Sequence, residues 1–220
     1  MDGTAKGSLD REFSLRQREV LEASLAVLVE RGVALTMTTV AARANCSKET
    51  LYKWFGDRNG LLEATVGWQA SKVRVSVPEG RPIDLEGLAE ALSRFASDWL
   101  TVVSSPTSIA LNRLAIGHSG EPTGKGGGLG AVVLANGRFA LAGRLKPVLE
   151  DARAVGLLRF GDAEEAFRGF FGLVARDVQI RLLLGDALAL DPATIQRDAA
   201  RATEQFITLY GAGRKPAQET

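Results

Sequence analysis

The sequence predicts an all-helical protein of about nine helices, in which a small N-terminal module of three helices precedes a larger C-terminal bundle. Three observations support this fold class. Apolar residues recur at alternating steps of three and four, Gly and Pro stand between these stretches, and alternating β-branched runs bounded by hairpin turns are absent. In a chain of 220 residues, 45% hydrophobic and 24% charged residues are typical of a globular protein that folds by burial.

The N-terminal part of the chain contains four expected helices. The first spans residues 16–31 and ends before Gly32, a residue that favours helix termination. Two short helices follow at 37–44 and 48–55. The fourth begins near residue 59 and ends before Pro78, because a proline disfavours helix in the residue before it.

The C-terminal part contains five more expected helices, at 84–102, 106–118, 129–155, 162–184 and 192–210. A glycine-rich loop at 120–130 separates the second from the third, in which Pro147 should cause a kink or a break. The domain boundaries that we expect are an arm at 1–14, a first domain at 15–58, a second at 59–211 and a tail at 212–220.

Charge and cysteine content argue against a globally basic nucleic-acid binder, a disulfide-stabilised protein and a zinc protein. With 27 basic and 26 acidic residues there is no global positive field, so any nucleic-acid contact must come from a local cluster. The lone Cys46 and the lone His118 provide neither an internal disulfide nor a zinc cluster, and we expect no metal and no cofactor. Neither a signal peptide nor a membrane span is predicted, so the expected location is the cytoplasm.

Residues 36–62 carry the most specific signal in the sequence. Thr36 is placed to cap one short helix, and Asn45 stands where a left-handed terminator is needed. Ser47 then caps a second short helix whose buried side holds Leu51 and Phe55. The other side presents cationic, hydroxyl and aromatic groups suited to a major groove, so the pattern predicts a DNA-binding helix-turn-helix. A tight helix pair within a core is the less specific alternative.

These residues resemble the signature of the TetR family of transcriptional regulators, over about residues 15–65. The matching positions are Thr36, Val40, Ala41, Ala44, Asn45, Cys46, Ser47, Leu51, Tyr52, Lys53, Trp54, Phe55 and Arg58. Asn45 stands where the family usually has Gly, and Trp54 where Tyr or His is usual. The resemblance implies that the protein binds double-stranded operator DNA as a homodimer and responds to a small, largely apolar effector.

Roles follow from the resemblance one residue at a time. Base contacts are expected from Lys48, Glu49 and Thr50. Contacts with the phosphate backbone are expected from Tyr52 and Lys53, and from the helix N-termini that carry Thr36, Ser47 and Arg58, with Trp54 beside them. Lys6, Arg11 and Arg16 are candidates for a minor groove.

The C-terminal bundle resembles the family's ligand-binding and dimerisation domain in helix count and order. Aromatic residues there are core by default, and an effector pocket is expected to involve Phe95, Trp99, His118, Phe139 and Phe170. The last two helices are expected to pair with those of a second copy through Phe167, Phe171, Val174, Val178, Ile195, Ala199, Ala202 and Phe206.

Other functions remain as alternatives. An enzyme is not expected: Gly124 and Lys125 suggest a phosphate-binding loop, but Ser119 and Gly126 break its pattern and no strand precedes it. The mechanism that the resemblance implies is repression relieved by a ligand. A transcriptional activator, and a helical ligand-sensing or partner-binding protein without DNA binding, are the remaining alternatives.

Overall fold

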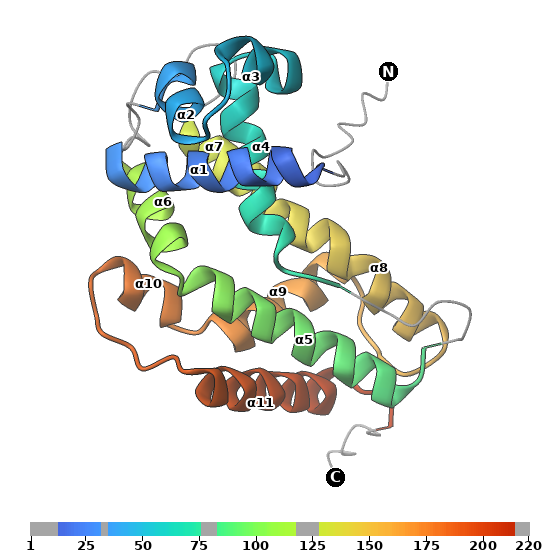
Figure 1. The fold of residues 1–220 in the computed structure, drawn as a ribbon. Helices are drawn as coiled ribbons and strands as arrows, with labels where there is room; N and C mark the ends of the chain where they lie inside the picture. The colour runs from blue at the N-terminus through green and yellow to red at the C-terminus, as the bar shows by residue number, and fades with distance from the viewer. Residues whose placement is uncertain (1–12, 32–34, 76–82, 118–127, 214–220) are drawn as a thin grey trace. The chain divides into compact units, whose positions relative to one another are not determined.

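The computed structural model describes residues 13–31, 35–75, 83–117 and 128–213, and within these ranges the fold is all-helical with no strand (Figure 1). The helices, in chain order, are α1 (Leu15–Arg31), α2 (Met37–Arg43), α3 (Lys48–Phe55), α4 (Arg58–Ser71), α5 (Leu85–Val103), α6 (Pro106–Gly117), α7 (Leu129–Leu134), the π-helical turn η3 (Ala135–Phe139), α8 (Ala140–Ala154), α9 (Ala163–Ala175), α10 (Val178–Leu183) and α11 (Pro192–Tyr210). No described helix is long and apolar enough to cross a membrane.

The helices form two compact units that interleave along the chain. The first unit comprises Met1–Lys72 and Ser105–Leu141, and the second comprises Val73–Ser104 and Ala142–Thr220. Each unit therefore consists of two segments that are separated in the sequence.

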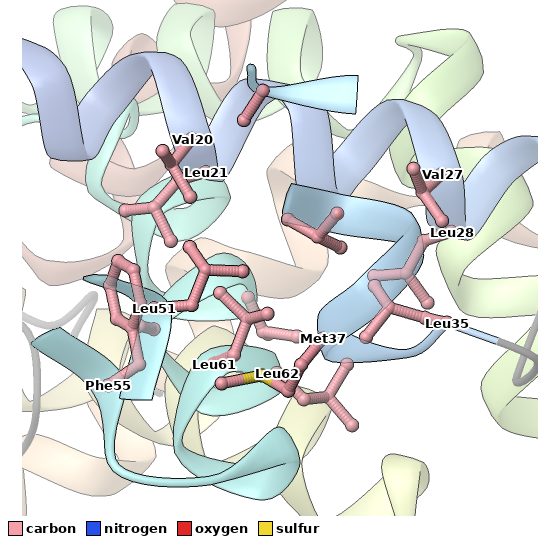
Figure 2. Close-up of a cluster of buried hydrophobic side chains, with 14 of the residues drawn as sticks. Val20, Leu21, Val27, Leu28, Leu35, Met37, Leu51, Phe55, Leu61 and Leu62 are labelled. Atoms are coloured by element: carbon pink, nitrogen blue, oxygen red, sulfur yellow. The ribbon is translucent and has the colours of Figure 1, made fainter. Parts of the chain in front are cut away.

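The core of the first unit is built from α1 to α4 together with α6 and α7. Figure 2 shows part of this core, in which Leu21 of α1, Met37 of α2, Leu51 of α3 and Leu61 of α4 contribute to one cluster. Leu111, Ala115 and Leu129 complete the cluster from the second segment of the unit. Burial of these apolar faces, rather than helix propensity, holds helices as short as α2 and α3 in place.

The core of the second unit is aromatic. Phe170 of α9 lies against Phe95 of α5 and Phe206 of α11, at ring-centroid distances of 6.1 and 5.2 Å. All three side chains are fully buried. The end of α11 is held by backbone hydrogen bonds from Arg159 N to the Tyr210 carbonyl (2.7 Å) and from Ala212 N to the Leu157 carbonyl (3.0 Å).

Pro147 does not break its helix, in contrast to one of the two expected outcomes. The helix α8 continues from Ala140 to Ala154 through the proline. Pro147 and Gly143, the residue four positions earlier whose carbonyl loses its partner, are both exposed, so water can satisfy that carbonyl. The irregularity lies upstream instead, in the π-helical turn η3.

The single helix expected at 162–184 is wrong, because the structure has two helices there. The chain breaks between α9 and α10 at Arg176, whose backbone has φ 42° and ψ −123°. Neither glycine nor proline marks this break in the sequence, and positive φ is rare for other residues. His118 and residues 120–127 of the expected loop lie outside the described residues.

Candidate nucleic-acid interface

The N-terminal end of α2 is fixed by a reciprocal cap. The Thr36 hydroxyl accepts a hydrogen bond from Thr39 N (3.1 Å), and Thr39 Oγ1 accepts one from Thr36 N (3.0 Å). This confirms the expected role of Thr36 as a helix cap. Thr36 is exposed, so the start of α2 is open to solvent.

The turn between α2 and α3 depends on Asn45 and on a residue from α1. Asn45 has φ 49°, the left-handed conformation expected for it, and Cys46 N donates to the Ala41 carbonyl at 3.0 Å. The Arg16 guanidinium donates to the carbonyls of Ala44 (2.6 Å) and Asn45 (3.0 Å). Arg16 thus holds the turn that positions α3.

This contact of Arg16 has no signature in the sequence, because Arg16 and Ala44 lie 28 residues apart. Its guanidinium is engaged with the turn and with Glu19 at 2.6 Å, which leaves its expected minor-groove role without support in the geometry. Lys6 and Arg11, the other two candidates for that role, lie outside the described residues.

The helix α3 has one buried face and one exposed face. Ser47 caps it by accepting a hydrogen bond from Thr50 N at 3.1 Å, and Leu51 and Phe55 are buried as expected. The opposite side, which we call the outer face of α3, consists of Lys48, Glu49, Tyr52 and Lys53. All four are exposed, and the Tyr52 side chain is 52% exposed.

Thr50 stands at the edge of the outer face. It is half-buried, and its hydroxyl lies 3.0 Å from that of Ser47. Trp54 is also half-buried and packs edge-on against Phe55, with ring centroids 6.2 Å apart. The Trp54 ring therefore supports the buried side of α3 more than its outer face.

The junction between α3 and α4 requires glycine at two positions. Gly56 has φ 80°, and Gly60 lies so close to the end of α3 that a Cβ atom there would stand 2.1 Å from the Phe55 carbonyl oxygen. The Asp57 carboxylate caps α4 by accepting a hydrogen bond from Gly60 N at 2.8 Å. Gly60 thus fixes the approach of α4 to α3, a role that sequence reasoning missed.

Arg58 is engaged with its own unit. Its Nε donates to the Leu35 carbonyl at 2.8 Å, which ties the start of α4 to the segment before α2. Arg58 therefore helps to position the two short helices.

The charges and polar groups of the outer face suit a partner that carries both anionic groups and hydrogen-bonding groups. Neither ammonium, of Lys48 or of Lys53, forms an ion pair with any residue in the described ranges. Hydrogen bonds from its own backbone N–H and from Ser47, with the nearby Lys48 charge, lower the pKa of Glu49 below its ordinary value of 4.5. At neutral pH the face therefore combines two cations, one carboxylate and a phenol, groups that can contact phosphates and base edges.

Three of the expected effector residues, Phe95, Trp99 and Phe170, lie in the aromatic core of the second unit. Phe95 and Phe170 are buried against each other, and Trp99 packs on Phe171 with ring centroids 4.9 Å apart. Phe139, at the end of η3, is 61% exposed and belongs to the other compact unit.

Most of the expected dimer contacts are used within the protomer. Seven of the eight side chains are buried in the second unit: Phe167, Val174, Val178, Ile195, Ala199, Ala202 and Phe206. The spacing of these residues correctly predicted a buried helix face, but other helices of the same chain bury it. Among the eight, only Phe171 is half-buried and partly accessible to a second copy.

Comparisons with known proteins agree with this geometry. The family model for "Bacterial regulatory proteins, tetR family" matches residues 20–65, and that for "AefR-like transcriptional repressor, C-terminal domain" matches residues 90–212. A solved TetR transcriptional regulator from Agrobacterium tumefaciens is 44% identical, with a TM-score of 0.74 over 91% of this chain and 97% of its own.

Two further relatives are more distant. The solved structure of the "Flavonoid-responsive Regulator FrrA" is 26% identical, with a TM-score of 0.66 over 90% of this chain and 98% of that chain. The HTH-type transcriptional regulator BetI of Paraburkholderia phytofirmans is 33% identical over 75 residues. That match covers 31% of this chain and 38% of the relative, so the chain matches well under half of the length of this curated protein.

The two family matches together span both the helix-turn-helix and the C-terminal bundle, and the Agrobacterium structure aligns over nearly the whole chain. The chain belongs to the TetR family of bacterial transcriptional regulators, and α2 and α3 form its DNA-binding helix-turn-helix.

Proposed function

We propose that the protein is a cytoplasmic, ligand-responsive transcriptional repressor that binds a palindromic operator as a homodimer. The observation that carries the proposal is the outer face of α3: it is exposed, polar and free of ion pairs with other described residues, while α1, α2 and α4 pack behind it. The match to the family of AefR-like transcriptional repressors supports the direction of the regulation.

The proposal of a homodimer rests on the short length of α3, the helix that is proposed to contact bases. One helix of eight residues contacts too few base pairs to select a site in a genome, so two copies must bind half-sites about 34–36 Å apart. The contact between copies is proposed for the outward sides of α9 and α11, where Phe171 is half-buried and Leu209 is 68% exposed.

The side chains on and around α3 divide into two groups. Lys48, Glu49 and Thr50, in the first turn, are proposed to contact base edges. Tyr52 and Lys53, with the helix N-termini at Thr36, Ser47 and Arg58 and with Trp54, are proposed to contact or support contacts with phosphates.

The effector is proposed to be small and largely apolar, and to bind in the C-terminal bundle. The similarity to a flavonoid-responsive regulator supports regulation by a small molecule. To release the operator almost completely, the effector must bind the DNA-free conformation about 10⁴-fold more tightly, or about 5.5 kcal/mol.

Selection of bound sequences from a random DNA pool tests the proposal directly. We expect a palindrome whose half-site centres are one helical turn apart, bound by two copies in sedimentation analysis. Transcription from a reporter carrying this site should fall when the gene is present. No enrichment, or a single-copy complex on an asymmetric site, would contradict the proposal, and increased transcription would identify an activator.

Variants of the outer face test the division of roles. We expect Tyr52→Ala and Lys53→Ala to weaken binding to operator and random DNA alike, and Lys53→Ala to reduce the salt slope by about 1. Lys48→Ala should instead change the base preference of the selected site. Equal losses on both DNAs for all three variants would refute this division.

A further inference from the structure

The second compact unit has a groove on its surface that the proposed function does not use. The helices α5 and α11 lie side by side there (Figure 1) and border an open groove of about 710 Å³. This volume is large enough to hold part of a small molecule. The groove lies between the first half of α5 and the second half of α11, away from the outer face of α3 in the sequence and in a different unit.

The walls of the groove are mainly apolar. Leu85 and Ala89 line it from α5, and Ala200 and Ile207 line it from α11. Leu85 is 49% exposed, so a large apolar side chain faces water when the groove is empty. An apolar ligand body that covers these side chains would gain free energy from their removal from water.

Two carboxylates give the groove a negative charge. Glu86 of α5 and Glu204 of α11 both line it, and no lysine or arginine is among the described residues of the lining. Neither carboxylate forms an ion pair within the described part of the chain. The N-terminus of α5 stabilises Glu86, but Glu204 lies towards the C-terminal end of α11, where the helix dipole gives an acid no support.

Thr203 supplies an unpartnered hydroxyl at the same place. It lines the groove, is only 4% exposed, and its Oγ1 has no hydrogen-bond partner among the residues that the structure describes. A buried hydroxyl without a partner costs free energy, and a threonine in a helix usually bonds to a preceding carbonyl instead. Rotation about χ1 by one staggered position places the hydroxyl where the methyl group now stands, and a ligand N–H that reaches it there can supply the missing hydrogen bond.

From these three features together we infer that the groove is a binding site for a protonated amine with an apolar body. The body covers Leu85, Ala89 and Ile207, the ammonium lies between the Glu86 and Glu204 carboxylates, and one N–H donates to Thr203. A neutral or anionic ligand of the same shape lacks the electrostatic part of this recognition.

Calorimetry with the full chain and three probes of one shape tests the inference: 4-phenylbutylamine, 4-phenylbutanol and 4-phenylbutyrate. The titrations contain no DNA, so their outcome is independent of repression. We expect the amine to bind roughly tenfold more tightly than the alcohol, since two exposed charge pairs contribute about two- to fivefold each, and the carboxylate not to bind. Equal binding of amine and alcohol would overturn the inference.

Variants locate the site. Glu86→Gln and Glu204→Gln should each weaken amine binding about two- to fivefold, whereas Glu165→Gln, which alters an exposed acid on α9 outside the groove, should leave it unchanged. Thr203→Val should weaken binding without lowering the unfolding temperature, because it removes an unsatisfied hydroxyl.

Ala200→Trp, at an exposed position of the groove, should abolish amine binding while the circular dichroism stays the same. Unchanged amine affinity in both glutamine variants and in Ala200→Trp would overturn the inference. So would dissociation of a dimer in Ala200→Trp, since a second copy would then be the occupant of the groove.

Discussion

The chain turns sharply on either side of α3 and again between α9 and α10. The residues at the turns beside α3 suit their backbone conformation better than the residue between α9 and α10 does. At each junction one residue adopts positive φ. These residues are Asn45 and Gly56 beside α3, and Arg176 between α9 and α10. Beside α3 the residue type suits the conformation, and Arg16 and Asp57 add hydrogen bonds to it. At Arg176 the side chain is unsuited to φ 42° and ψ −123°, and an ion pair with Asp198 accompanies the strain.

The difference shows where the fold demands accuracy. The position of α3 fixes where its outer face stands, and the proposed contacts with DNA depend on it, so small errors in this position matter. The α9–α10 junction only redirects the chain within a bundle, so a strained backbone is tolerable. Substitutions at the junctions should therefore affect DNA binding near α3 and stability alone near Arg176.

Gly60→Ala should have the largest effect. The new methyl group would stand 2.1 Å from the Phe55 carbonyl oxygen, and because both atoms are fixed to backbone, α3 and α4 must separate. We expect the free energy of unfolding to fall by about 2–3 kcal/mol and operator affinity to fall at least tenfold. Chemical denaturation and gel-shift titration measure the two effects.

Gly143→Ala is the matched control in α8, outside the proposed contact between copies. An added Cβ meets nothing within 4 Å there, so this exposed helix position should gain about 0.5–1 kcal/mol with no change in DNA binding. If Gly60→Ala bound the operator normally, the close approach of α4 would not govern the position of α3.

Arg16→Ala should have the next largest effect. It removes a charged donor from the Ala44 and Asn45 carbonyls, and since the side chain is 47% exposed we expect a loss of about 1–2 kcal/mol in the free energy of unfolding. Operator affinity should fall about tenfold because the turn is no longer held.

Arg168→Ala removes an exposed ion pair in α9 and serves as the control, with an expected change within about 0.5 kcal/mol. Equal DNA affinity of Arg16→Ala and the natural protein would show that Arg16 is not needed to hold the turn.

Arg176→Gly should stabilise the protein. Relief of the strained backbone, about 1–3 kcal/mol, exceeds the entropic cost of glycine and the loss of the exposed ion pair to Asp198. We expect a net gain of about 0.5–1 kcal/mol in thermal unfolding, with unchanged DNA binding. Asn45→Gly should change stability by only a few tenths of a kcal/mol, since asparagine already tolerates its conformation. A net loss of stability in Arg176→Gly would mean that the ion pair matters more than the strain.

Glu49 should give the smallest effect, visible as a function of pH. Hydrogen bonds to its carboxylate lower the pKa of Glu49 in the folded protein below 4.5. The stabilisation is therefore complete above the unfolded pKa and is lost as the pH falls through the lower folded pKa. An NMR titration should place the pKa of the Glu49 carboxyl below its value in the urea-unfolded chain. Glu49→Gln should remove the pH dependence of this step, and a folded pKa above the unfolded value would contradict the hydrogen bonds to the Glu49 carboxylate.

The helix-turn-helix was predictable because its signals are local. Thr36, Asn45 and Ser47 each act on the next few residues, and the structure confirms all three. Arg16 and Gly60 were not predictable, since their partners are distant in sequence or depend on how closely two helices approach.

In the C-terminal bundle, periodicity identified buried faces but not what covers them. Phe167 and Phe206 were assigned to a partner subunit, yet their own protomer buries them. Of the two outcomes expected for Pro147, the break is wrong because α8 continues through it. The break at Arg176, in contrast, has no glycine or proline to predict it.

The interleaving of the two units along the chain limits how this regulator can be dissected or recombined. A fragment that stops at Lys72 would leave out Leu111, Ala115 and Leu129, which share a core with α1 and α4. Such a fragment would expose the hydrophobic surface that these residues cover, and it would tend to aggregate. A chimera that gives this protein's operator specificity to a relative should therefore transplant residues 105–141 together with the amino-terminal helices, as two grafts rather than one.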